Sequence, residues 1–202
     1  MTEYRRTDDG VEVPDRESRA LARVEIRMDG DRPMLDGYAT VYDYRYDVAG
    51  GPENGGFTEL IAQRAAAKSA AEADVRLLVN HGGLPLARTK SGTMELVSDD
   101  VGLRVRAELD PSNPVVTELR SAMNRGDLDE MSFGFRVLRD AWSADYSERT
   151  ISEVKLFDVS LVTYPANPAT VAMMRAEELP AEALPGRSLA LARRQYEALS
   201  YR

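Results

Sequence analysis

The stretch Glu130-Met131-Ser132-Phe133-Gly134-Phe135 predicts a β-strand whose two faces differ in chemistry. Side chains alternate sides along a strand, so Met131, Phe133 and Phe135 share one face while Ser132 and Gly134 share the other. The apolar face suits a buried core. On the opposite face a small hydroxyl stands beside a residue without a side chain. This face could admit a substrate backbone, or it could be a stripe of small residues packed under a helix.

Strand signals continue on both sides of this stretch and are separated by turns. Residues 22–28 alternate apolar and charged side chains, and residues 98–102 join two apolar segments with a composition typical of a hairpin. We expect strands at residues 22–28, 37–42, 75–80, 93–97, 103–109, 130–138 and 151–163. Strands joined mainly by hairpins favour an antiparallel sheet. We therefore expect a mainly β fold with flanking helices (α+β), built on an antiparallel β-barrel of about seven strands.

Two or three helices are expected among these strands. Apolar residues and an alanine run fit a helix over residues 57–73. Pro114 in the first turn, apolar residues at helical spacing and Gly126 just past the end indicate a second helix. A short third helix is expected from Asn167 to Met174.

The two ends of the chain differ in composition from its centre. Residues 1–20 are rich in charge and poor in apolar spacing, so we expect a disordered leader. Residues 21–175 form the expected folded domain. Residues 176–202 contain Pro180 and Pro185-Gly186 and then a basic segment that could form an amphipathic helix, so we expect a flexible or helical tail.

Composition excludes several classes of function. The formal net charge of the 202 residues is −8, which argues against a nucleic-acid binder and a peripheral membrane protein. The absence of cysteine excludes disulfides and thiol catalysis, and a single histidine excludes a His-rich metal site. We expect neither a cofactor nor a metal. With no secretory signal and no apolar span of membrane length, a soluble cytoplasmic protein is expected.

His81 is the one residue that could supply imidazole chemistry. It follows the predicted strand at residues 75–80 and precedes Gly82-Gly83, and catalytic groups often project from the ends of strands. The alternative is a structural histidine at or near the surface.

Asp158 interrupts an apolar strand, Leu156-Phe157-Asp158-Val159-Ser160-Leu161-Val162. A carboxylate in such a strand needs a partner because an unpaired buried charge is costly. An imidazole N–H would suit, and so would one of the many arginines. Glu153, five residues earlier, is expected to be exposed.

These pieces together resemble the HK97-type prohead proteases of tailed bacteriophages, whose fold is similar to that of the herpesvirus assemblins. The resemblance covers about residues 22–175 and rests on an ordered set of short motifs rather than on any single one. The motifs are Leu35-Asp36-Gly37-Tyr38-Ala39, Phe57-Thr58-Glu59 after a Gly-rich loop, Val79-Asn80-His81, Pro85-Leu86-Ala87-Arg88-Thr89, Val101-Gly102-Leu103, Met131-Ser132-Phe133-Gly134-Phe135 and residues 158–168.

The resemblance implies a serine endopeptidase. Ser132 matches the nucleophile of that family and His81 matches its base. Asp158 stands where the third member is usually Glu, which keeps the charge and shortens the side chain by one methylene. In such a triad the acid orients the imidazole, and the geometry rather than the chain order defines the triad.

The resemblance also implies the partners and the place of action. The expected substrates are the scaffold segment of the major capsid protein and the protease itself, with self-association, inside the immature capsid (prohead) in the host cytoplasm. The competing hypothesis is a non-enzymatic scaffold or capsid-assembly factor on the same fold.

Overall fold

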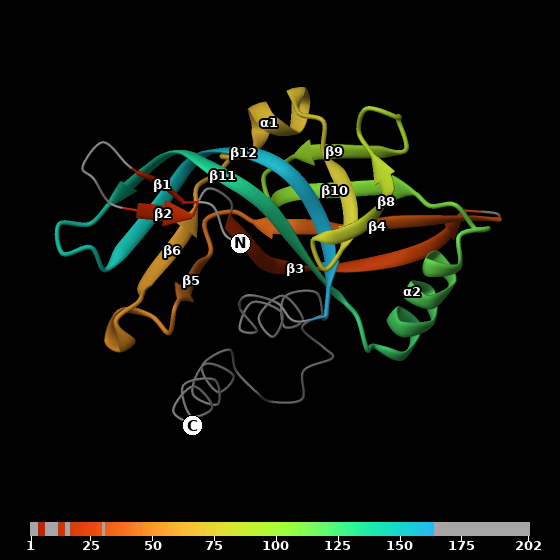
Figure 1. Cartoon of the computed structure of the whole chain (residues 1–202), viewed down its shortest axis with the longest axis horizontal. Helices are drawn as coiled ribbons and strands as arrows, with labels where there is room; N and C mark the ends of the chain where they lie inside the picture. The colour runs from red at the N-terminus through yellow and green to blue at the C-terminus, as the bar shows by residue number, and fades with distance from the viewer. Residues whose placement is uncertain (1–3, 7–11, 15–16, 30, 164–202) are drawn as a thin grey trace.

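The computed structural model describes residues 4–6, 12–14, 17–29 and 31–163 (Figure 1). The described strands are β1 (Tyr4–Arg6), β2 (Glu12–Pro14), β3 (Glu17–Asp29), β4 (Arg32–Val41), β5 (Arg45–Val48), β6 (Phe57–Ile61), β7 (Arg76–Val79), β8 (Gly82–Arg88), β9 (Met94–Ser98), β10 (Gly102–Glu108), β11 (Glu130–Trp142) and β12 (Glu148–Val162). The helices are α1 (Ala67–Glu72) and α2 (Pro114–Arg125), with a 3-10 turn η1 at Pro52–Asn54. The prediction of a mainly β fold with flanking helices is therefore confirmed.

One large sheet contains every described strand except the β1–β2 pair. Its strand order is β5-β6-β12-β11-β3-β4-β10-β9, and β7 joins β12 on one side and β8 on the other. The long strands β11 and β12 pair with each other and run across the molecule (Figure 1). Most pairs are antiparallel, but β6 and β7 both lie parallel to β12, at its two ends.

The prediction of an antiparallel β-barrel of about seven strands is wrong, because the sheet is not closed. Among the described residues, ten strands form the large sheet, and the strands at the ends of its path, β5 and β9, each pair on one side only. Closing the path would require pairing between β5 and β9, and the sheet does not have it. Helix α1 contacts both β9 and β12.

The core lies on the apolar face of the central strands. Met131, Phe133 and Phe135 are fully buried, and the two phenyl rings stack with centroids 4.4 Å apart. The predicted alternation of β11 is therefore confirmed, with its apolar side in the core.

Helix α2 and the β9–β10 hairpin confirm two local predictions. The Asn113 side chain caps α2 by accepting a hydrogen bond from the Val115 N–H at 3.0 Å, Pro114 starts the helix and Gly126 ends it at φ 75°. In the hairpin Leu103 pairs with Ser98.

The predicted helix over residues 57–73 is wrong in its first half. Residues Phe57–Ile61 form β6, which pairs with β5 and β12, and only Ala67–Glu72 are helical. Glu59 and Ile61 are both buried, with the two-residue period of a strand. The buried acid hides that period from a hydrophobicity pattern.

The predicted leader, residues 1–20, contains strands in its described part. β1 and β2 pair with each other, and β3 begins at Glu17, so the large sheet starts inside the segment expected to be disordered. The third predicted helix and the predicted tail, residues 167–174 and 176–202, lie outside the described residues. In the described part of the chain, no helix has the length and apolar character needed to span a membrane.

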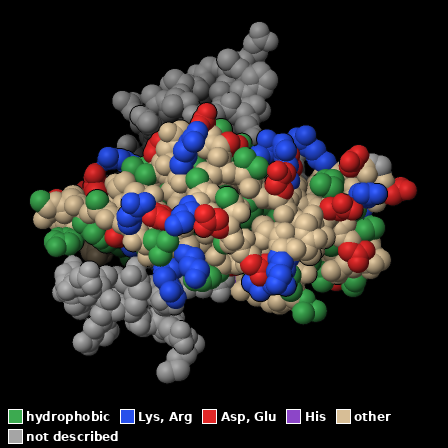
Figure 2. All heavy atoms as spheres, turned by 90° about the horizontal axis from the view of Figure 1, so that it is seen from above, with side chains coloured by type: hydrophobic (Ala, Val, Ile, Leu, Met, Phe, Trp, Pro, Cys, Tyr) green, Lys and Arg blue, Asp and Glu red, His purple; other side chains and the backbone are tan. Residues whose placement is uncertain are grey.

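Acidic and basic side chains are interspersed over the face seen from above (Figure 2). Hydrophobic side chains on that face are scattered singly or in small groups between them. Such mixing avoids a large field of one sign on this face.

Candidate functional site

His81 lies in a two-residue turn between β7 and β8. Val79 pairs with Gly82 across the hairpin, so Asn80 and His81 are its central residues. Their φ angles are 50° and 55°, the left-handed values that a type I′ turn requires at both positions. Asn and His are among the non-glycine residues that enter this region most readily. The turn therefore holds His81 at the tip of the β7–β8 hairpin.

Asn80 ties this turn to the end of β12. Its backbone N–H donates to Leu161 O at 2.8 Å. Its side-chain Oδ1 accepts from the Thr163 N–H at 2.9 Å, and its Nδ2 donates to Thr163 Oγ1 at 3.1 Å. Three hydrogen bonds thus fix the residue that precedes His81.

Ser132 and Asp158 are placed by the ladder between β11 and β12. Ser132 pairs with Ser160, and Gly134 pairs with Asp158. Residues two apart on one strand share a face, so these four residues lie on the face opposite the stacked phenylalanines. β7 runs parallel to β12 on its other side, which brings the His81 turn to the same region.

The three residues predicted as a site form one chain of hydrogen bonds. Asp158 Oδ1 lies 2.6 Å from His81 Nδ1, and His81 Nε2 lies 3.0 Å from Ser132 Oγ. An ionised carboxylate only accepts hydrogen bonds, so Nδ1 carries the imidazole proton and Nε2 accepts from the Ser132 hydroxyl. Nε2 is then able to take the hydroxyl proton when the serine oxygen attacks an electrophile.

The three residues of the hydrogen-bonded chain differ in how far their side chains are exposed to solvent. The Asp158 side chain is 2% exposed and the His81 side chain 22%. Ser132 is also buried. A buried carboxylate holds its charge only with good hydrogen-bond partners, and the imidazole is one of them. The structure thus gives Asp158 the imidazole partner that its sequence position suggested.

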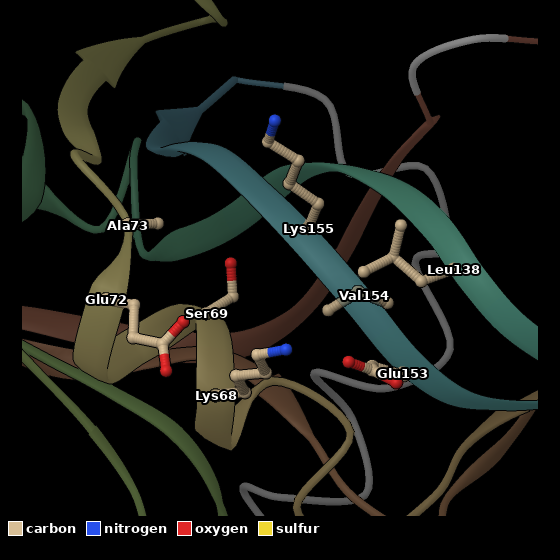
Figure 3. A pocket seen from close by; sticks show the side chains of 8 residues that line it. All are labelled: Lys68, Ser69, Glu72, Ala73, Leu138, Glu153, Val154 and Lys155. Carbon is tan, nitrogen blue, oxygen red and sulfur yellow. The ribbon is translucent and has the colours of Figure 1, made fainter.

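Glu153, the other acid considered for the site, lies elsewhere on β12. Its side chain is mostly buried rather than exposed as predicted, and Oε2 lies 2.5 Å from Arg139 Nη2. It lines a pocket of about 260 Å³ between α1 and the β11–β12 ladder, together with Lys68, Glu72 and Lys155 (Figure 3). None of the three residues in the hydrogen-bonded chain lines that pocket.

Two polar residues of the site were missed by reasoning from the sequence. Ser160 donates to Asp158 Oδ1 at 2.8 Å, and Asn80 holds the turn. The sequence does carry a signal for each. Ser160 has the same alternation phase as Asp158, and Asn in front of another turn residue is a common start of a type I′ turn.

A second buried polar cluster lies away from the hydrogen-bonded chain, where β5, β6, β11 and β12 meet. Glu59 accepts from Arg149 Nη1 at 3.1 Å and from the Tyr46 hydroxyl. Arg149 Nε also donates to Asp140 at 2.8 Å, and its guanidinium lies 5.4 Å from the Trp142 ring centroid. These contacts explain why an acidic residue, Glu59, can be fully buried in β6.

Known proteins resemble this chain in sequence. One curated relative, the prohead protease of Enterobacteria phage HK97, is 28% identical over 147 residues, which cover 71% of this chain. The match spans 60% of the length of that relative. Among solved structures, the capsid assembly protease of bacteriophage T4 matches 74% of this chain and 99% of its own, with 15% identity and a TM-score of 0.41.

A family model gives the broadest match. The model described as Caudovirus prohead serine protease matches residues 22–182, which is most of the chain and includes His81, Ser132 and Asp158. This chain therefore belongs to the Caudovirus prohead serine protease family.

Proposed function

We propose that this protein is a serine endopeptidase in which Ser132 is the nucleophile, His81 the general base and Asp158 the acid that orients the imidazole. One observation carries the proposal: a single imidazole contacts a buried carboxylate through Nδ1 and a serine hydroxyl through Nε2. Membership of a serine protease family supports it.

The reaction follows from the positions of the protons. Ser132 Oγ attacks the scissile carbonyl carbon while His81 Nε2 takes the hydroxyl proton, which leaves an imidazolium beside the Asp158 carboxylate. The imidazolium gives that proton to the leaving amine, and an acyl-enzyme remains. Water then attacks the ester, with His81 again taking and returning one proton, and the acid product and free Ser132 are released.

For substrates, we propose the scaffold segment of a major capsid protein and the protease itself, with self-association, inside an immature capsid in the host cytoplasm. The family description, which names the prohead, and the relative named prohead protease support this assignment. The proposed self-cleavage site lies within about residues 175–202, because linkers with proline and glycine are common sites of proteolysis.

The test is co-expression of the chain with the major capsid protein of its own phage, for the wild type and for Ser132→Ala. Intact-mass analysis should find capsid-protein fragments and a shortened protease in the wild type alone. Loss of one oxygen leaves almost no cavity, so the variant should fold. Equal fragments in both samples would assign cleavage to another protease. Intact proteins that still associate in both would instead support the non-enzymatic assembly factor.

A further inference from the structure

Ser160 stands opposite Ser132 in the β11–β12 ladder, yet its hydroxyl is directed to Asp158. It is fully buried, and its Oγ donates to Asp158 Oδ1 at 2.8 Å. The same Oδ1 atom lies 2.6 Å from His81 Nδ1. One carboxylate oxygen therefore has two donors, one from its own strand and one from the β7–β8 turn.

The shared oxygen gives the Ser160 hydroxyl a geometric consequence. A carboxylate on a single χ2 torsion can rotate and offer either oxygen to a neighbour. The Ser160 hydroxyl stabilises the rotation that places Oδ1 at the imidazole. A hydrogen bond to the ionised form also favours a charge at a site from which water is largely excluded.

We propose that Ser160 is a positioning residue of the hydrogen-bonded chain: its hydroxyl fixes the orientation of the Asp158 carboxylate and, through it, the tautomer of His81. This proposal rests on the function proposed above, because the tautomer with a free Nε2 lone pair is the one that can accept the proton of Ser132. The alternative is that the Ser160 hydrogen bond only stabilises β12 and has no effect on the tautomer of His81.

The variants Ser160→Ala and Ser160→Cys form a series of donor strength, since alanine has no donor and a thiol is a weak one. Ser69→Ala is the matched control. Ser69 is also buried, and its hydroxyl accepts from the Leu156 N–H at 2.8 Å on the same strand β12, outside the hydrogen-bonded chain.

Two measurements apply to the full chain. The first is the rate of labelling of Ser132 by a fluorophosphonate, which requires no knowledge of the cleavage sequence. The second is the ¹⁵N NMR spectrum of the imidazole, which reports the tautomer without overlap because His81 is the single histidine of the chain. Thermal unfolding of each variant reports its stability.

We expect Ser160→Ala to lower the labelling rate about tenfold or more, with Ser160→Cys between it and the wild type, because a hydrogen bond to a charged group is lost. The Nε2–H tautomer should gain population in the same order. Ser69→Ala should lower the unfolding temperature and leave both the rate and the tautomer unchanged.

Unchanged labelling and an unchanged tautomer in folded Ser160→Ala would overturn the proposal, and so would equal effects of Ser69→Ala. If Ser160→Ala does not fold, the Ser160→Cys result decides by the same criteria. Failure of the proposed function has a different signature. In that case the wild type itself is not labelled at Ser132, whereas the NMR comparison still reports whether Ser160 controls the tautomer.

Discussion

His81 Nδ1 lies 2.6 Å from Asp158 Oδ1, although 77 positions separate the two residues along the chain. The parallel pairing of β7 with β12 produces this contact, because Asp158 pairs with Arg76 and the His81 turn follows at the end of β7. The site therefore depends on a non-local pairing that sets two strands side by side. Its members can be tested separately.

Asp158→Ala should lower the rate of labelling of Ser132 by roughly 10³- to 10⁴-fold, because the imidazole loses the group that orients it. Asp158→Glu should keep substantial activity, since it retains the carboxylate and matches the acid expected from the resemblance. Glu153→Gln on the same strand is the control and should have no effect, because Glu153 pairs with Arg139. Full activity of Asp158→Ala would place the third role elsewhere or leave a dyad.

The left-handed backbone at His81 predicts a difference between two inactive variants. At φ 55° alanine meets a steric penalty that glycine avoids, so His81→Gly should be more stable than His81→Ala by about 1 kcal/mol. Urea unfolding measures the difference, and both variants should be unreactive towards fluorophosphonate. Equal stabilities would mean that the turn relaxes away from the type I′ geometry when the imidazole is absent.

The buried Glu59–Arg149 pair should matter far more for stability than an exposed pair nearby. Arg149→Met removes a guanidinium that is 6% exposed from a carboxylate that is 0% exposed, and should cost about 3–5 kcal/mol of unfolding free energy. Arg45→Met is the control: Arg45 and Glu148 are 64% and 50% exposed, and their pair should contribute less than about 1 kcal/mol. Similar losses in the two variants would contradict the buried network.

Stability should depend on pH through Asp36. The Arg104 guanidinium, which donates to both oxygens of Asp36 at 2.9 and 2.8 Å, holds the pKa of Asp36 below its usual value. A lowered folded-state pKa stabilises the protein above the ordinary value, and this contribution is lost as the pH falls through the folded-state pKa. Urea unfolding of the wild type and Asp36→Asn should therefore differ at neutral pH and converge in acid. A difference independent of pH would exclude this ion pair as its source.

Local signals in the sequence predicted local structure well. Pro114 and Gly126 bracket α2 as expected, and the turn at residues 98–102 joins β9 to β10. Both features are decided by a few neighbouring residues. The assignment of His81, Ser132 and Asp158 to one site came instead from the resemblance, because the local setting of each residue left a structural alternative open.

Features set by distant pairing could not be predicted in the same way. No local pattern tells that β6 and β7 lie parallel to β12, or that the end strands β5 and β9 of the large sheet do not pair with each other. The period of β6 was hidden because its buried Glu59 is stabilised by Arg149, 90 positions away in the chain. A polar residue with a distant partner thus accounts for the missed strand. Ser160 was missed although its partner Asp158 is only two residues away, because buried serines are common and the direction of a hydroxyl cannot be read from the sequence.

The most direct measurement of the central claim is fluorophosphonate labelling followed by peptide mass mapping, for the wild type, Ser132→Ala and His81→Ala. The account predicts one adduct, on the peptide that contains Ser132, in the wild type. It predicts no adduct in Ser132→Ala and labelling slowed by about 10⁵-fold or more in His81→Ala, a larger loss than in Asp158→Ala because the base reacts and the acid only orients it. An adduct on a different serine, or equal labelling rates in the wild type and His81→Ala, would contradict it.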